Sequence, residues 1–196
     1  MTASDCAAAL GIPAFESFRG DPRAHCIQEK VYGKFKGNIF TKWGCEHEDM
    51  VCDRFGETVG EQVLMFGLLV HPDLPWLGAS PDGICARSGL MVEIKCPMRR
   101  KIVPGEVPHH YMPQVQVQLE VCDLEACAFV QWQPAHLSYN GEEFFDITIV
   151  QRDREWFSKN RDTLYSFWEE LMEARANYVP PPPPVCLIKE NMYDDL

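Results

Sequence analysis

Three charged residues in the middle of the chain stand at spacings that suit phosphate chemistry. Asp82 lies in the segment Ser80-Pro81-Asp82-Gly83, and Glu93 and Lys95 flank Ile94 in an apolar run. Alternate residues of a strand point to the same face, so we expect Glu93 and Lys95 to lie side by side while Ile94 points into a core. A hairpin joining the two segments would bring Asp82 beside Glu93.

Two carboxylates held close together repel each other unless a cation lies between them. Carboxylate oxygens suit Mg²⁺, with Mn²⁺ as the alternative, and such an ion activates a water and stabilises charge on a phosphate. Taken singly, the Asp82 segment fits a type I turn and the Glu93/Lys95 pair fits an exposed ion pair. The apolar context makes an exposed pair less favoured, because it predicts burial of Leu90, Met91, Val92, Ile94 and Cys96.

A second acidic residue is placed by helical spacing. Thr41 can cap a helix over residues 42–55, in which Glu48 falls on the same face as Gly44, Val51, Cys52 and Phe55. Most glutamates are exposed, and this one shares the apolar face. The opposite face is solvated, with Glu46, Asp49 and Asp53.

The remaining elements follow from residue type and periodicity. Strands are predicted over 61–70, 76–80, 90–95, 126–132 and 144–150, and helices over 3–10 (capped by Ser4 or Thr2) and 154–176. Residues 19–40 are interpreted as a loop holding one helix. The segment 111–122 alternates like a strand over its glutamines, but its apolar residues also fit a helical stripe; its length favours a helix. The expected fold is α/β in one domain over residues 1–179, followed by a proline-rich tail over residues 180–196.

The order Asp…Glu-x-Lys is the signature of the PD-(D/E)xK nucleases. The longer string "GASPDG…EIKCP" resembles the lambda exonuclease and YqaJ-like viral recombinase family, also called alkaline exonucleases. Three further segments are similar to that family: residues 2–11, "KWGCEHEDMVCDRF" at 42–55 and "YMPQVQVQLEV" at 111–121. The resemblance spans roughly residues 2–170, and four segments in the right order make it specific.

The resemblance implies a restriction-endonuclease-like mixed sheet of about five strands and a metal-dependent exodeoxyribonuclease. Such enzymes digest linear duplex DNA 5′ to 3′ and leave a 3′ single strand for annealing in recombination. It implies that Asp82, Glu93 and the Ile94 carbonyl hold the metal, that Glu48 completes or orients a second metal site, and that Lys95 positions the water. Gln114 is assigned to the active-site wall, and the role of Gln118 is left open.

Ser4 matches a serine that, in the family, helps to hold the 5′-phosphate of the DNA end. Its alternative role is that of an N-cap, and both roles are compatible because helix N-termini bind phosphate. Lambda-like members carry an arginine several residues before this serine, which is not found ahead of Ser4 here. We therefore expect Arg99, Arg100 and Lys101 to supply the missing cations, against the alternative of a solvated basic face.

Composition sets further bounds. The 196 residues carry a net charge of −11, which argues against a protein that simply coats nucleic acid, although basic residues gather locally. Nine cysteines, odd in number and without C-x-x-C spacing, indicate reduced thiols in the cytoplasm or nucleus and make a zinc site less favoured. The sequence has no apolar run long enough to cross a membrane and no basic leader, so we expect neither a membrane span nor a secretory signal.

Two alternatives stay open at this point. An endonuclease of the same superfamily would share the chemistry, and an inert module that binds DNA ends or a recombination partner would need no intact site. The presence of Asp82, Glu93 and Lys95 argues against the inert module. The expected partners are double-stranded DNA ends and a single-strand annealing protein, and family members can form trimeric rings.

Overall fold

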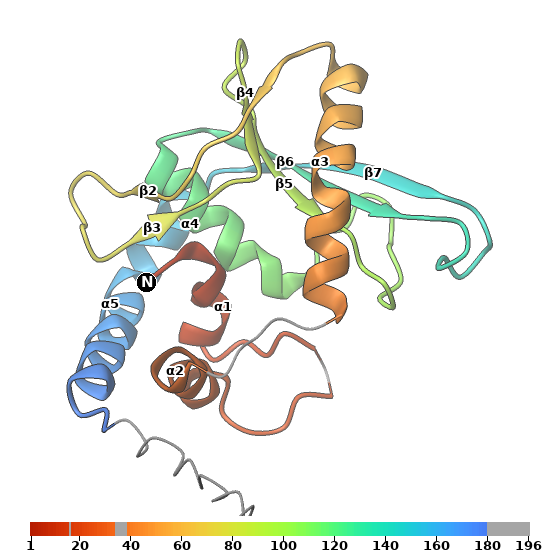
Figure 1. Cartoon of the computed structure of the whole chain (residues 1–196). Coiled ribbons are helices and arrows are strands. Elements are labelled where there is room, and N and C mark those ends of the chain that lie inside the picture. The colour runs from red at the N-terminus through yellow and green to blue at the C-terminus, as the bar shows by residue number, and fades with distance from the viewer. Residues whose placement is uncertain (16, 34–38, 180–196) are drawn as a thin grey trace, which may run out of the picture.

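A mixed five-stranded sheet forms the centre of the fold (Figure 1). The computed structural model describes residues 1–15, 17–33 and 39–179. The sheet order is β1-β4-β5-β6-β7, and the strands are β1 (Val63–Leu64), β4 (Gly83–Cys85), β5 (Met91–Lys95), β6 (Ala126–Gln133) and β7 (Phe144–Gln151). Only the β5–β6 pair is parallel within this sheet. Two short strands, β2 (Leu69–Val70) and β3 (Gly78–Ala79), pair with each other in a separate ribbon.

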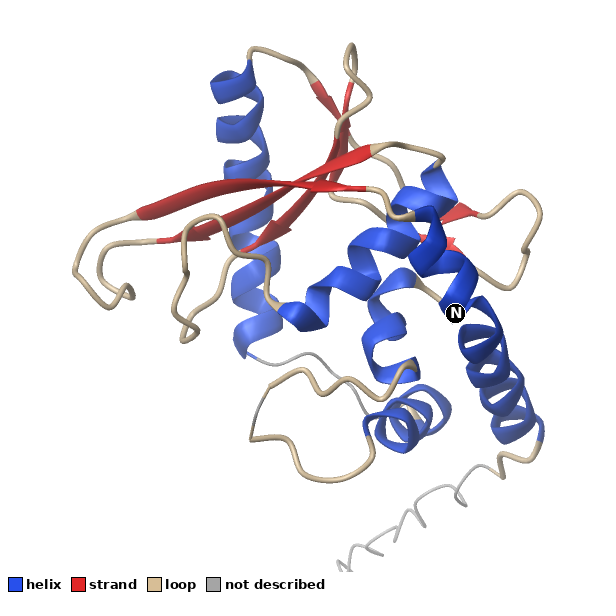
Figure 2. Cartoon of the chain, turned by 180° about the vertical axis from the view of Figure 1, so that it is seen from behind, coloured by secondary structure: helices blue, strands red, loops and turns tan. Residues whose placement is uncertain are grey.

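Helices surround the sheet, as Figures 1 and 2 show from opposite sides. Their bounds are η1 (Ala3–Asp5), α1 (Cys6–Ala9), α2 (Pro22–Tyr32), α3 (Ile39–Val59), η2 (His109–Tyr111), α4 (Met112–Cys122) and α5 (Arg154–Ala176). The parallel strands β5 and β6 need a crossover, and η2 and α4 supply it. The helix expected over 111–122 is confirmed, and so is the α/β class with a five-stranded mixed sheet.

The alternation of side chains along β5 and β6 gives the sheet two separate cores. On one face, Val92 and Ile94 pack with Ala128 and Val130 against Val51, Cys52 and Phe55 of α3. On the other face, Met91 packs with Cys127 and Phe129 against Val115 and Leu119 of α4. Glu93 and Lys95 share the parity of Met91, so they lie on the α4 face. Ile94 is 5% exposed, as predicted for its position between them.

A third core joins the chain start to the last helix. Cys6 and Ala9 pack with Leu77, Val117, Leu164 and Phe167. Thr2 caps the first turn through a capping box with Asp5, so Thr2 is the N-cap and Ser4 is not. This core fixes the short N-terminal helix against α4, where it sits beside the site.

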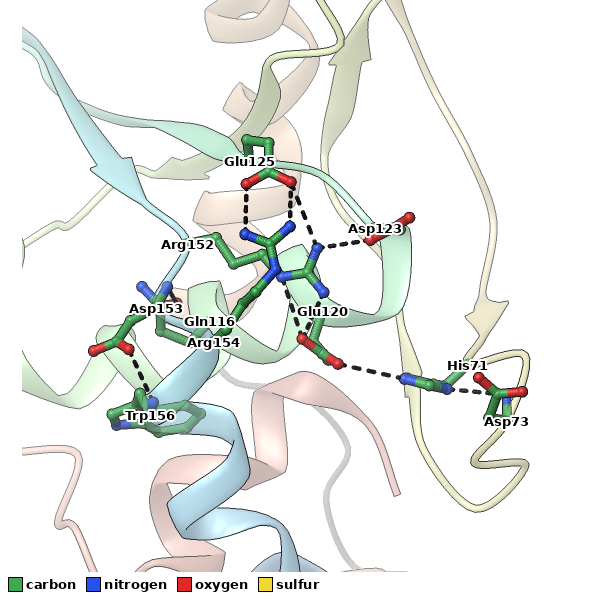
Figure 3. Close-up of polar contacts among 10 residues, drawn as sticks. All are labelled: His71, Asp73, Gln116, Glu120, Asp123, Glu125, Arg152, Asp153, Arg154 and Trp156. Carbon is green, nitrogen blue, oxygen red and sulfur yellow. Dashed lines mark hydrogen bonds and ion pairs between the residues drawn. The ribbon is translucent and has the colours of Figure 1, made fainter.

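A cluster of charged residues fastens the C-terminal end of α4 to the end of β7 (Figure 3). The Arg152 side chain is 7% exposed and donates from Nη2 to Glu120 at 2.7 Å and from Nη1 to Asp123 at 2.7 Å. Arg154 adds a fork of two hydrogen bonds to Glu125. Gln116 accepts from the Asp153 main chain at 2.7 Å. The position of α4, which carries Gln114 and Gln118, is therefore set by these contacts as well as by its apolar face.

Two expectations about element boundaries are wrong. The single strand predicted over 61–70 is two short strands in different sheets, because β1 pairs with β4 while β2 pairs with β3. The chain between them exposes Met65 and Leu68. Thr41 is not an N-cap either, since α3 already includes Ile39. The other long elements lie within a few residues of their predicted bounds.

The expectations about the tail, the cysteines and membrane spans can be compared with the described residues only. The proline-rich tail, residues 180–196, lies outside the described residues. The eight cysteines within the described ranges are all free thiols. No helix among the described residues is both long and apolar enough to cross a bilayer.

Candidate active site

The β4–β5 hairpin brings Asp82 to the middle of β5. Gly83 pairs with Val92, and the carboxylate of Asp82 accepts a hydrogen bond from the main-chain nitrogen of Ile94 at 2.5 Å. The glycine is required by close packing, because a Cβ on Gly83 would lie 2.2 Å from Cγ1 of Val63. The predicted meeting of Asp82 with the Glu93–Lys95 segment is therefore observed, and its register is set by the hairpin.

Glu93 is almost completely buried and is held by three donors. It is 1% exposed. Its Oε1 accepts from Lys95 Nζ and, at 2.5 Å, from Gln114 Nε2, while its Oε2 accepts from Gln118 Nε2 at 2.7 Å. A buried carboxylate is tolerated only with such partners. The two glutamines of α4, four residues apart on one helix face, thus fix the carboxylate from above the sheet.

Burial and mutual repulsion shift the acids at this site. Burial raises the pKa of Asp82 well above its usual range, and the neighbouring Glu93 and Glu48 raise it further. Burial also raises the pKa of Glu48, with Glu93 acting in the same direction and Lys95 opposing it. Asp82 also acts on the pKa of Glu48, in the lowering direction, so the two carboxyl groups lie close together. Three acids from α3, the β3–β4 connection and β5 therefore lie close together. The meeting of Asp82 and Glu93 was predicted from the hairpin, whereas the family resemblance implied the presence of Glu48.

Lys95 remains charged in this setting. Burial acts to lower its pKa, but the charges of Glu93 and Asp82 and the hydrogen bond to Glu93 outweigh burial and raise the pKa above its ordinary value. Its ammonium lies 5.1 Å from the ring centroid of Tyr111. An ammonium held between carboxylates and an aromatic face suits the role of orienting a water or stabilising developing negative charge.

The donor set of the site fits a hard divalent cation. Two carboxylates held this close repel each other, and a divalent ion between them would offset that repulsion. Mg²⁺ commonly uses one or two carboxylates and keeps several waters. Among the described residues, no group of three or more His, Cys, Asp or Glu side chains is arranged to hold a metal ion. An ion would therefore draw on Asp82 and Glu48 or Glu93 together with the Ile94 carbonyl, water and substrate.

Two adjoining clefts open at this end of the molecule. The larger, about 1080 Å³, is lined by residues that include Glu48, Ile94, Lys95, Arg99 and Arg100. The smaller, about 820 Å³, is lined by residues that include Ser4, Lys30 and Gln114. His110 and Tyr111 line both, so they stand where the clefts meet. Burial and the nearby charges of Arg100, His109 and Lys95 lower the pKa of His110.

The structure separates the four residues expected to bind a 5′-phosphate. Ser4 is exposed and faces the smaller cleft, where its hydroxyl lies 3.1 Å from that of Thr2. Arg99 and Arg100 line the larger cleft with Lys95. The Lys101 ammonium lies 4.2 Å from the ring centroid of Tyr139, on the β6–β7 connection. Ser4 and the arginines are thus on different clefts.

Sequence reasoning did not assign roles to several residues of the site. Gln118 was left open, although its spacing from Gln114 was a usable signal. Tyr111 begins the family-like string at 111–121 but received no role from it, and no pattern marks His110 as a cleft residue. Gln131 is a buried amide in an apolar strand, and only its partners in the fold show what it holds.

The fold and the site together define an α/β domain that holds carboxylates and a lysine at the end of a hairpin. The model of the YqaJ-like viral recombinase domain matches residues 1–125. The chain belongs to the YqaJ-like viral recombinase family.

Individual relatives agree with this assignment. An uncharacterized protein, R354, of Acanthamoeba polyphaga mimivirus is 33% identical over 113 residues, which are 50% of this chain and 21% of the viral protein. The chain thus spans about a fifth of the length of that curated relative. The crystal structure of an alkaline exonuclease, LHK-Exo, from Laribacter hongkongensis is similar with a TM-score of 0.67 and 26% identity, over 90% of this chain and 89% of that chain.

Two further solved structures share the fold. LHK-Exo in complex with dAMP gives a TM-score of 0.69 at 24% identity, over 90% of this chain and 89% of that chain. A phage-related exonuclease from Haemophilus somnus gives a TM-score of 0.64 at 15% identity, over 88% of this chain and 95% of that chain. The family and its alkaline exonuclease relatives support a nuclease role for this chain.

Proposed function

We propose that the chain is a Mg²⁺-dependent exodeoxyribonuclease that digests linear duplex DNA 5′ to 3′ and leaves a 3′ single strand for recombination. The observation that carries the proposal is the partly buried cluster of Asp82, Glu93 and Lys95, with Glu48 beside it. A cleft of about 1080 Å³, which Glu48 and Lys95 line, opens onto this cluster. Nuclease relatives of similar fold support the reaction class.

The roles of the residues follow from their contacts. Asp82, Glu93 and the Ile94 carbonyl would hold the metal, and Glu48 would complete or orient a second metal position. When bound, the ion would supply Lewis acidity toward the phosphate and lower the pKa of a bound water. Lys95 holds its ammonium next to Glu93 and would orient the attacking water. Gln114 fixes Glu93 and would offer its amide to a water or a phosphate oxygen.

The DNA end would be held across the two clefts. Ser4 and the adjacent helix start would contact the terminal 5′-phosphate in the smaller cleft, while Arg99 and Arg100 would contact the strand in the larger one. Lys101 would add a charge at the rim. A single-strand annealing protein is the proposed partner for the product strand, and a ring of three copies is the proposed assembly around duplex DNA.

Asp82→Asn and Glu93→Gln test the metal-ligand assignment. Each change removes a negative ligand at constant volume, so we expect loss of Mg²⁺-dependent cleavage on the order of 10³-fold, because the ion contributes several kcal/mol to the transition state. Folding, followed by circular dichroism, and duplex affinity in EDTA should be retained. Glu155→Gln, on the exposed face of α5, is the matched control. Near-normal Mg²⁺-dependent rates in Asp82→Asn or Glu93→Gln would overturn the assignment.

A further inference from the structure

The strand next to Lys95 carries a buried glutamine that contacts an arginine of the larger cleft. Lys95 is paired with Gln131 in the parallel β5–β6 register, so both side chains lie on the α4 face of the sheet. Gln131 is completely buried. Its Oε1 accepts from Arg100 Nη2 at 2.8 Å, and its Nε2 donates to the Glu106 carbonyl at 3.0 Å. Both ends of this amide are therefore engaged in holding the loop that follows β5.

Tyr111 holds the guanidinium of Arg100 on its other side. The Arg100 carbon Cζ lies 5.9 Å from the ring centroid of Tyr111, and the ammonium of Lys95 lies 5.1 Å from the same centroid. Tyr111 in turn packs against Phe129 of β6 at 5.5 Å. One ring thus contacts two of the cations that line the larger cleft, and its packing on the sheet fixes that ring.

Gln133, two residues further along β6, holds the backbone of the same loop. Its Nε2 donates to the Pro97 carbonyl at 2.9 Å and to the Arg100 carbonyl at 3.4 Å. The neighbouring cations are positioned differently: Arg99 and Lys101 are exposed and lie over the rings of Phe40 and Tyr139. Of the three basic residues after β5, Arg100 alone is half-buried and bonded to a β6 side chain in the described part of the chain.

A guanidinium fixed in this way is preorganised for a phosphate. Arg100 donates from Nη2 to Gln131 and, at 3.3 Å, from Nη1 to the Lys101 carbonyl. Three of its five N–H groups remain for a phosphate in the cleft that it lines, and a planar fork suits a phosphate oxygen pair. Binding then orders little additional side-chain freedom. We propose that Arg100 contacts a phosphate of the strand being cut in the larger cleft, and that Gln131 is the positioning residue for Arg100. This inference rests on the proposed nuclease function.

A double-mutant cycle tests the pair. The variants are Arg100→Met, Gln131→Met and their combination, because methionine keeps the volume but offers neither a charge nor an amide. Asn160→Leu is the matched control for losing a partly buried amide: Asn160 is half-buried on α5, bonds to the Trp156 carbonyl and lines neither cleft. The measurements are the single-turnover rate and KM with Mg²⁺ on a linear duplex, and duplex affinity in EDTA at several salt concentrations.

Arg100→Met should lower kcat/KM about 10- to 100-fold, the range expected for a hydrogen bond to a charged group. It should also reduce the salt slope of binding by about one. Gln131→Met should lower kcat/KM about 5- to 20-fold, because Arg100 would be present but misplaced. In the Arg100→Met background, Gln131→Met should change the rate by no more than about twofold, because Gln131 acts through Arg100. Asn160→Leu should stay within about twofold of the parent rate.

The outcomes separate this inference from the nuclease proposal. A parent protein that cuts no DNA would refute the proposed function itself. If the parent cuts DNA, two results overturn the inference: wild-type kinetics in both single variants, or losses that multiply in the double variant, which would show that Gln131 acts independently of Arg100. If Gln131→Met does not fold, Gln131→Asn, whose shorter side chain cannot reach both partners, takes its place in the cycle.

Discussion

Glu93 illustrates how single residues set the chemistry of this site. Its carboxylate is buried, and its neighbours are one lysine and two glutamines rather than a shell of water. Each of these partners is a donor to the carboxylate, and Glu93 and the ring of Tyr111 hold the ammonium of Lys95 in place. A lysine held in this way acts through position more than through affinity for DNA.

Lys95→Ala should therefore lower turnover much more than DNA binding. The loss of one preorganised donor to developing charge costs on the order of 10²–10³ in kcat, whereas duplex affinity should change only a few-fold. Lys159→Ala, on the exposed surface of α5, is the control for loss of a positive charge. A large fall in affinity with turnover preserved would instead make Lys95 a phosphate anchor.

The sequence predicts the meeting of the charged residues of the site, but it does not predict the residues that position them. Asp82, Glu93 and Lys95 were predicted to meet because strand parity and a hairpin require it, and the structure shows them together. Gln131 and Tyr111 could not be placed in the same way. Their roles depend on which strand lies beside β5 and on how α4 crosses the sheet. Neither of these tertiary features can be predicted from a local sequence pattern.

At the scale of elements, α4 depends on a charged cluster at its C-terminal end as much as on its packing. Arg152 is the centre of that cluster (Figure 3), with Glu120, Asp123 and Glu125 around it. Glu120 is also 3.8 Å from the Nε2 atom of His71, whose Nδ1 accepts from the main chain of Asp73 and Leu74. The cluster therefore joins α4, β7 and the β2–β3 connection.

Arg152→Met should destabilise the fold by about 1–3 kcal/mol, measured by urea unfolding at pH 7. Removing one partner of a buried ion pair costs about 3–5 kcal/mol, and the exposure of Asp123 and Glu125 reduces that figure here. Arg161→Met, whose ion pair with Asp162 is exposed, is the control and should change stability by less than about 0.5 kcal/mol. Equal stabilities of the two variants would contradict the role given to Arg152.

The same cluster predicts a pH dependence of stability. The hydrogen bond from Arg152 and its charge lower the pKa of Asp123, and Arg154 lowers the pKa of Glu125 in the same way. A carboxylate with a lowered pKa contributes stability above its unfolded value, near 4, and that contribution is lost as the pH falls through its folded value. The free energy of unfolding, measured from pH 5 to pH 3, should accordingly fall less steeply in Arg152→Met than in the parent protein.

Element boundaries were predictable where a long apolar pattern governs them and not where tertiary pairing does. The helices over 112–122 and 154–176 follow their patterns. The segment 61–70 has the composition of one strand, yet its two halves pair with different partners. Composition identifies a segment that favours extended structure, but it does not specify which neighbouring strand will accept its hydrogen bonds.

At the scale of the whole molecule, a strongly acidic chain places its cations where a nucleic-acid strand would enter. The net charge is −11, whereas Lys95, Arg99 and Arg100 line one cleft with His109 and His110. A local cationic cleft on an acidic body favours capture at one site over coating along a duplex. The adjoining cleft beside Ser4 gives that site a second compartment, which the proposed action on a DNA end would use.

The central claim is that this site hydrolyses DNA from an end with the help of a metal ion. The most direct measurement follows strand shortening on a linear duplex with a 5′-phosphate, a matched duplex with a 5′-hydroxyl, and a covalently closed circle, each in Mg²⁺ and in EDTA. We predict shortening of the linear duplexes in Mg²⁺ alone, faster with the 5′-phosphate, and an intact circle. Rapid cutting of the circle, or cleavage that persists in EDTA, would contradict the account.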